Sequence, residues 1–280
     1  MSLCVRLILC LVGFLHLILS NCSTNLNPYV FDTRGRLSQV DAAYKASSKG
    51  GTVLAIKGAE SLVVFTCSQR ESSGSLMTKL TPNRPSSFCH SISYIASGIA
   101  ADSQYLANKM FGKVSNHMYL FGTDPSIYRL SKEAADLIHT RTMTNERPLG
   151  IKAIFCGHDK QGQLALIEID PIGNLYDCKV SCLGPMATKI LEFFDKSQDV
   201  LNLNTDEVIK CGLESLRRAV HDMQDERCNL HFSEVGLAIH TSSHGTWHAD
   251  ECVLKILIEN DNHEAVSRAM LAYFSSTSEG

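Results

Sequence analysis

The sequence predicts an α+β sandwich, a globular domain in which sheets and helices form separate layers, with short extensions. Along the chain the expected order is strands, two helices, strands, two helices and a strand. Grouped strands followed by paired helices favour such layers over alternating β–α–β units. The length of 280 residues and the hydrophobic share of 44% are sufficient for a sizeable core.

The first element expected in the domain is a short helix at residues 33–47. Leucine, valine and tyrosine recur there at helical spacing, and Thr33 is a possible N-terminal cap. A Gly-Gly pair then breaks the helix. Two apolar runs at residues 52–57 and 61–67 flank a short Gly-Ala-Glu turn, which predicts a β-hairpin.

An exposed loop, a strand and two helices are expected next. Residues 71–87 are rich in Ser, Thr and Pro, which is typical of a loop, and an apolar run at 92–99 follows. From 101 to 120 and from 125 to 142, apolar residues recur every three or four positions. This period predicts two consecutive amphipathic helices.

Three strand-like stretches begin the second half of the domain, at residues 151–159, 163–170 and 174–184. Short turns that contain glycine separate them, and this favours antiparallel pairing. The remaining elements are expected as helices at about 185–196 and 205–222, a strand at 233–240 and a charged C-terminal helix from about 260.

The beginning of the chain has the pattern of a secretory signal. Arg6 precedes an apolar run from Leu7 to Leu19, and small polar residues follow it. The run is shorter than the roughly 20 apolar residues that a transmembrane helix needs. Residues 1–24 are therefore expected to be a cleaved leader or a misassigned extension, and no stable membrane span is expected.

Net charge and cysteine placement restrict the partners and the compartment. A formal net charge of -3 offers no broad attraction for nucleic acid, so no nucleic-acid partner is expected. Four of the eleven cysteines fall inside apolar strand-like runs and are interpreted as buried free thiols, namely Cys67, Cys156, Cys178 and Cys182. Buried thiols indicate a reducing compartment whereas the leader indicates export, and we give the body of the chain more weight.

Two spacings could suggest metal binding. His240, His244 and His248 recur every four residues, which on a helix would align three imidazoles for zinc. The intervening Ser-Ser and Gly instead predict a turn between strands, so no metal site is expected. Cys178 and Cys182 are also four residues apart, but on a single expected strand they share one face as core residues.

Residues 31–46, FDTRGRLSQVDAAYKA, resemble the signature that opens proteasome α subunits, F-S-P-[DE]-G-R-L-x-Q-V-E-Y-A-x-K-A. Further matches follow in register across roughly residues 29–240, with GGT at 50–52, TKL at 78–80, SGIAAD at 97–102, RPLG at 147–150 and DPIG at 170–173. The resemblance implies the four-layer αββα sandwich of the proteasome subunit fold, which is related to N-terminal-nucleophile hydrolases. It implies an N-terminal segment and helix at 29–48, a sandwich domain at 49–260 and a C-terminal helix or tail at 261–280.

The resemblance also implies a structural subunit without catalytic residues or a cofactor. In the family register, the catalytic threonine position falls on or next to Gly51, which has no side chain. The lysine that assists proton transfer falls near Arg84, and arginine remains protonated. The acidic residue of the first hairpin falls near Cys67. Two alternatives remain open, an N-terminal-nucleophile hydrolase processed to expose Thr52 and a divergent or secreted relative with a binding role.

Family membership would place the chain in the outer heptameric ring of the core particle, with other α and β subunits as partners. Such rings gate substrate entry and receive the C-terminal tails of regulatory activators during ATP- and ubiquitin-dependent degradation. Lys79, in the TKL match, is expected to bind a tail carboxylate by a charge-assisted contact, beside Gly35 and Leu37. By resemblance the protein is expected in the cytoplasm and nucleus, with the secretory route as the alternative.

The ring and gate segment is expected to comprise Tyr29, Phe31, Arg36, Gln39 and Asp41. Several positions depart from the family's pattern: the signature's proline is Thr33 here, its helix tyrosine is Ala42, and the family's Tyr-Asp pair near the start is at best Tyr29. These departures put an ordinary gate in question and leave ring membership as the expectation.

Overall fold

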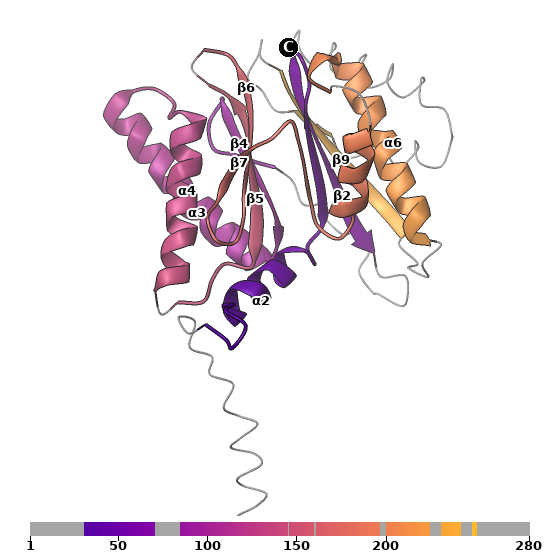
Figure 1. Ribbon diagram of the computed structural model, residues 1–280. Helices are drawn as coiled ribbons and strands as arrows, with labels where there is room; N and C mark the ends of the chain where they lie inside the picture. Colours follow the sequence, from indigo (N-terminus) through magenta and orange to yellow (C-terminus); the bar gives the residue numbers. More distant parts are fainter. Residues whose placement is uncertain are drawn as a thin grey trace, which may run out of the picture.

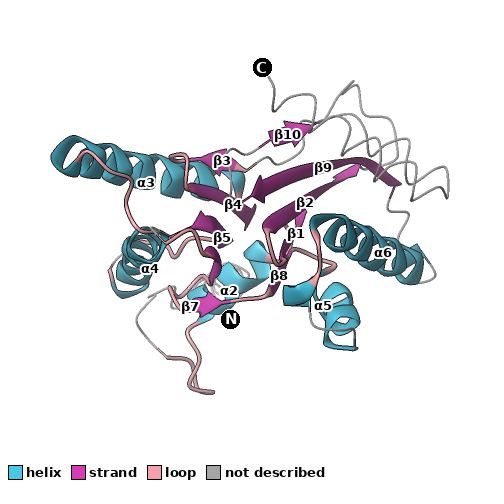
Figure 2. Ribbon diagram, turned by 90° about the horizontal axis from the view of Figure 1, so that it is seen from above, coloured by secondary structure: helices cyan, strands magenta, loops and turns pink. Residues whose placement is uncertain are grey.

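Antiparallel sheets packed face to face form the body of the protein, and helices cover both outer faces (Figures 1 and 2). The computed structural model describes residues 31–70, 85–144, 146–159, 161–196, 200–224, 231–241 and 248–250. The α+β class and the layered sandwich expected from the sequence are confirmed. Within these described ranges, no helix is long and apolar enough to cross a membrane.

Each sheet has five described strands. The first consists of β1 (Thr52–Lys57), β2 (Ser61–Arg70), β8 (Val180–Leu183), β9 (His231–Thr241) and β10 (His248–Asp250), in the order β10-β9-β2-β1-β8. The second follows the order of the chain, with β3 (Ser86–Ser87), β4 (Ile92–Gly98), β5 (Ile151–His158), β6 (Leu164–Ile169) and β7 (Leu175–Asp177). The helices are α2 (Ser38–Ser47), α3 (Ala100–Phe121), α4 (Ile127–Met143), α5 (Ala187–Lys196), the 3-10 helix η1 (Val200–Asn202) and α6 (Thr205–Gln224).

Clusters of buried apolar side chains fill the spaces between the layers of helices and sheets, whose stacking is seen in Figure 2. Helices α5 and α6 pack on the first sheet around Leu54 and Phe65, and α3 and α4 pack on the second around Tyr94 and Phe155. Val53 belongs to a third cluster, between the two sheets. Neighbouring residues of β1 therefore enter different layers, and because both faces are covered its residues 53–56 are a continuous apolar run.

Most of the expected elements are confirmed. The predicted hairpin is β1 and β2, which pair with Thr52 opposite Cys67. Helices α3 to α6 lie where four helices were expected, with ends within two residues of the expected ones. Strands β9 and β10, on either side of the expected turn, pair antiparallel, and residues 242–247 between them lie outside the described residues. The expected C-terminal helix and most of the 71–87 loop lie outside the described residues.

One expectation about the strands is wrong. Residues 174–184 form β7 and β8, which belong to different sheets, rather than one strand. The amide of Cys178 donates to a carbonyl of β6, while the carbonyl of Lys179 accepts from the amide of Lys57 on β1. Adjacent residues therefore bond to opposite sheets, and the chain crosses between them here. Cys178 lies between the strands and does not share a strand face with Cys182.

Two elements differ from expectation in extent. The end of the expected 71–87 loop forms the edge strand β3, which pairs with β4. Helix α2 starts at Ser38 with Leu37 as its N-cap, so Thr33 does not cap it. A turn at Asp32 occupies backbone amides that a longer helix would use, because its side chain accepts hydrogen bonds from them.

Candidate functional site

The opening segment is a tight turn held by one carboxylate. Oδ1 of Asp32 accepts the backbone N–H groups of Arg34 and Arg36, each at 2.8 Å. The hydrogen bond from the Arg36 amide is the main reason that the pKa of Asp32 lies below its usual value. Gly35 adopts φ +72°, a left-handed conformation that favours glycine. The Arg36 guanidinium lies 3.9 Å from the Asp32 carboxylate and 3.6 Å from that of Asp41, and so links the turn to the start of α2.

Helix α2 sits at one end of the sandwich, against β4 and β5 (Figure 1, indigo). Its buried residues are the small Ala43 and Ser47. Two glycines allow the close approach. A Cβ on Gly98 would lie 3.0 Å from the Cα of Ser47, and one on Gly150 would lie 3.0 Å from the Cβ of Ala46. Gly98 in the SGIAAD match and Gly150 in the RPLG match therefore leave space for this helix.

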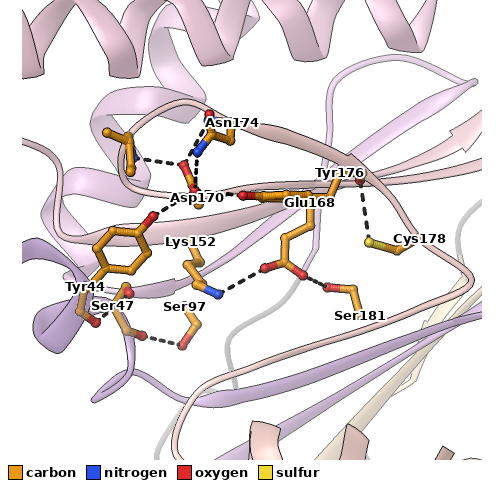
Figure 3. Close-up of polar contacts among 11 residues, drawn as sticks. Tyr44, Ser47, Ser97, Lys152, Glu168, Asp170, Asn174, Tyr176, Cys178 and Ser181 are labelled. Atoms are coloured by element: carbon orange, nitrogen blue, oxygen red, sulfur yellow. Dashed lines mark hydrogen bonds and ion pairs between the residues drawn. The ribbon is translucent and has the colours of Figure 1, made fainter. Parts of the chain in front are cut away.

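Tyr44 and Ser97 tie the helix to the body through hydrogen bonds (Figure 3). The Tyr44 hydroxyl donates to Oδ2 of Asp170 at 2.8 Å. The Ser97 hydroxyl, near the end of β4, lies 3.3 Å from the carbonyl of Ser47 and 2.8 Å from the carbonyl of Gly51. Ser97 therefore joins the end of α2 to the start of β1.

Asp170, which follows β6, accepts several hydrogen bonds at once (Figure 3). Its Oδ1 accepts the backbone N–H groups of Ile172 and Asn174 at 3.0 and 2.9 Å, and its Oδ2 accepts the Asn174 side-chain amide at 2.9 Å. The Tyr176 hydroxyl lies farther away, at 3.4 Å. Burial by itself would raise the pKa of Asp170, but these donors and the Tyr44 hydroxyl outweigh burial and hold the pKa below its usual value.

A second carboxylate bridges the two sheets (Figure 3). Glu168 on β6 accepts from the Lys152 ammonium on β5 at 3.1 Å and from the Ser181 hydroxyl on β8 at 2.7 Å. Strands β5 and β6 belong to the second sheet, whereas β8 belongs to the first. The carboxylate therefore holds the sheets together at the end of the sandwich where α2 is seated.

The positions of the family's catalytic residues lie in and beside the first hairpin. Thr52 is 1% exposed, and its hydroxyl has no hydrogen-bond partner among the described residues. Opposite it in the ladder lies Cys67, whose burial raises the pKa of its thiol to about 12. A thiol that stays protonated cannot take a proton from a hydroxyl, so the described hairpin offers Thr52 no activating group. Arg84 lies outside the described residues.

A pair of histidines, formed by His240 of the expected histidine series and His158, also joins the sheets. Nε2 of His240 on β9 lies 2.8 Å from Nδ1 of His158 on β5. His240 is fully buried, and burial, together with the repulsion of His158, lowers its pKa to about 4. Strand alternation could have placed both side chains between the sheets, but no local signal indicates that they meet. In the described parts of the chain, no group of three His, Cys, Asp or Glu could hold a metal ion.

Helix α3 carries an exposed apolar surface over its second half. It consists of Phe111, Met118, Tyr119, Leu120 and Phe121. Beside it, a hollow between α3 and α4 has charged and aromatic walls, which include Lys113, His117, Phe121, Arg129 and Glu133. Clustered exposed apolar side chains of this kind are typical of surfaces that bind another protein.

Most residues expected to form the ring and gate segment lie together. Phe31, Arg36, Gln39 and Asp41 occupy the opening turn and the first turn of α2, and Gly35 and Leu37 lie between them. Phe31 is 64% exposed. Tyr29 and Lys79 lie outside the described residues, so the expected contact of Lys79 with this segment stays a prediction.

Comparisons with known proteins agree with this architecture. The sequence profile of the family described as proteasome subunit matches residues 47–235. Proteasome subunit alpha of Picrophilus torridus is 29% identical over 196 residues, which is 69% of this chain and 81% of that protein. Proteasome subunit alpha type-2 of Saccharomyces cerevisiae is 28% identical over 194 residues, 68% of this chain and 76% of that protein. Proteasome subunit alpha type-1 of Dictyostelium discoideum is 26% identical over 199 residues, 70% of this chain and 77% of that protein.

Proposed function

Since the chain belongs to the proteasome subunit family, we propose that it is a non-catalytic α-type subunit in the outer heptameric ring of the core particle. The observation that carries this proposal is the opening turn with helix α2, which precedes β1 and is seated on the end of the sandwich. A subunit with an N-terminal nucleophile would have to expose the start of β1 instead. The similar proteins named as alpha subunits support the α type.

The absence of hydrolytic activity is proposed from the same end of the sandwich. The nucleophile position has no side chain at Gly51, and the next residue, Thr52, is buried. Ser97 hydrogen-bonds to the carbonyl of Gly51, so the backbone before Thr52 is part of the packed seat of α2. The neighbouring Cys67 thiol is protonated at neutral pH, and Arg84 would remain protonated as well. These features support a structural role.

Ring contacts are assigned to the opening segment and to α3, the elements through which the resemblance implies that α subunits meet their neighbours. The exposed Phe31 and the exposed apolar surface of α3 support this assignment, because both would lose contact with water in an assembly. Other α and β subunits are the proposed partners.

The ring assignment is tested by expressing the full chain with an affinity tag and examining it by native mass spectrometry. We expect assemblies with other α subunits. A variant lacking residues 29–48 should stay soluble but should no longer co-sediment with them, because the opening turn and α2 are gone. Entry of this variant into the ring would contradict the role of the segment, and a mature N-terminus at Thr52 in the intact mass would favour a hydrolase.

Docking of activator tails is proposed for Lys79. Its ammonium would meet the tail carboxylate in a partly desolvated cleft, beside the turn that contains Gly35 and Leu37. A charge-assisted contact of roughly 1.5–3 kcal/mol predicts that Lys79→Ala weakens tail binding by about one to two orders of magnitude. Lys79→Arg should keep part of the affinity and Lys79→Glu should be weakest. If tail peptides bind assembled particles of the unaltered chain, Lys79→Ala and Lys79→Glu with equal affinity at low salt, Lys79 is only a solvated loop residue.

Gating and location are proposed on the resemblance. Phe31, Arg36 and Asp41 would lie at the gate, although Thr33 and Ala42 replace the signature's proline and tyrosine. We place the protein in the cytoplasm and nucleus, where it would serve ATP- and ubiquitin-dependent degradation.

The secretory alternative is favoured by the signal-like leader and is tested directly. A chain that starts at Asn25 should assemble as well as the full chain. Recovery of the full chain only from the secretory pathway, with a glycan on Asn21 or with oxidised cysteines, would overturn the proposed location.

A further inference from the structure

Helix α2 lacks the large apolar anchors that usually hold a helix to a domain. It has ten residues, and its buried residues are Ala43 and Ser47. Isolated helices shorter than about 12 residues are marginal in water, so α2 depends on tertiary contacts. Its N-cap, Leu37, makes no side-chain capping hydrogen bond. The position of the helix must therefore come from a few specific ties.

Tyr44 lies within α2 and reaches an acceptor that is fixed without the helix. Its hydroxyl donates at 2.8 Å to Asp170, which lies 126 positions along the chain. The carboxylate of Asp170 is oriented by the backbone amides of Ile172 and Asn174 and by the Asn174 side chain. Because these donors belong to the loop after β6, the carboxylate presents its Oδ2 in a set direction (Figure 3).

The protonation states favour a strong bond between these two groups. Burial, followed by the hydrogen bond to Asp170, raises the pKa of Tyr44, so the phenol keeps its proton at neutral pH. The donors around Asp170 keep that residue ionised. A phenol that donates to a buried carboxylate makes a charge-assisted hydrogen bond, which is stronger and more directional than a neutral one.

We propose that Tyr44 is a positioning residue, whose hydrogen bond to Asp170 fixes the seat of α2 and with it the orientation of the Phe31–Asp41 segment. Ala42 stands where the family signature has its helix tyrosine, and Tyr44 brings a hydroxyl at a position that the signature leaves open. The seat of α2 follows from contacts within this chain. The consequence for ring entry rests on the proposed function.

Hydrogen–deuterium exchange of the full chain tests the seat, with Tyr44→Phe as the variant and Tyr176→Phe as the matched control. Each substitution removes one hydroxyl near the same carboxylate and keeps the ring, but Tyr176 belongs to β7 and lies 3.4 Å from Asp170. We expect Tyr44→Phe to speed exchange of the amides in residues 38–47 by about ten- to a hundredfold. The amides of β5 should keep their rates, and Tyr176→Phe should leave α2 unchanged.

Unchanged exchange of α2 in Tyr44→Phe would overturn the proposal, as would equal acceleration in both variants or an equal rise across the strands. Ring entry of the same proteins, measured by native mass spectrometry, separates the two conclusions. If the unaltered chain does not enter a ring, the proposed function is wrong while the exchange rates still decide the role of Tyr44. If it does enter, Tyr44→Phe should enter less efficiently than Tyr176→Phe.

Discussion

Replacing His240 by leucine should remove a pH-dependent loss of stability from the sandwich. The His158 and His240 rings are tilted by 17° and their centroids are 5.0 Å apart. The centroid distance equals the 2.8 Å distance between the two facing nitrogens plus the radius of each ring. The two imidazoles therefore meet edge to edge through these nitrogens and lie nearly in one plane. One proton between the two nitrogens makes a hydrogen bond, whereas protonation of both imidazoles would set two N–H groups and two positive charges against each other inside the protein.

The magnitude follows from the pKa of His240 in the two states. The unfolded imidazole has a pKa of about 6.5, whereas burial and the charge of His158 lower the folded value to about 4. Above about pH 6.5 both states are neutral and the pair contributes its full stability. As the pH falls, the unfolded state binds a proton that the folded state does not, and stability is lost down to about pH 4. The loss amounts to about 2 kcal/mol by pH 5 and roughly 3 kcal/mol by pH 4.

Equilibrium urea unfolding at about pH 7.5 and about pH 5 measures this difference. The unaltered chain should lose about 2 kcal/mol more than His240→Leu between the two conditions. His90→Gln, which changes an exposed histidine, should behave like the unaltered chain. Equal losses for the unaltered chain and His240→Leu would refute the reasoning, because the buried imidazole would then titrate alike in both states.

Two further substitutions test how the helices are attached to the second sheet. The Asp102 carboxylate accepts hydrogen bonds from the two terminal nitrogens of Arg147, at 2.7 and 2.8 Å, and from the Gly150 amide. Asp102→Asn should therefore lower the free energy of unfolding by about 2 kcal/mol in urea titrations. Gly98→Ala should yield little folded protein by circular dichroism, because its φ is +129° and a Cβ would lie 2.2 Å from the Gly150 carbonyl. Gly112→Ala is its control, since that Cβ meets nothing within 4 Å on α3 and should stabilise the helix by up to about 1 kcal/mol.

The sequence predicts the elements well where burial imposes a period. In α3, Leu106, Met110 and Val114 recur every four residues, and all three are buried against the second sheet. Residues 53–56 of β1 are all apolar because helices cover one face of the strand and the second sheet covers the other. In both cases the local pattern records which sides of an element are buried.

The crossing at Cys178 and the edge strand β3 could not be predicted in this way. The apolar residues on either side of Cys178 would be buried whichever sheet they joined, so the apolar pattern of the sequence does not indicate the change of sheet. Strand β3 is a Ser-Ser pair whose pairing with β4 comes from the neighbouring chain rather than from its own propensity.

The residues of the candidate site also differ in how well the sequence predicts them. The turn around Gly35 and Arg36 could be expected, because its residues are adjacent and match a signature. The partners Tyr44 and Asp170 are 126 positions apart, and His158 and His240 are 82 apart. Such pairs depend on the packing of whole sheets, which periodicity within one element does not describe.

The inward face of β5 explains how the two sheets keep one alignment. Its inward residues in order are Lys152, Ile154, Cys156 and His158, and the middle two belong to the apolar layer between the sheets. The outer two make polar links to the first sheet, Lys152 through Glu168 to Ser181 and His158 directly to His240. Apolar contacts tolerate small shifts, whereas hydrogen bonds at both ends of one strand are satisfied together only in one alignment. The apolar centre therefore stabilises the sandwich, while the polar ends of β5 specify the alignment on which the seat of α2 depends.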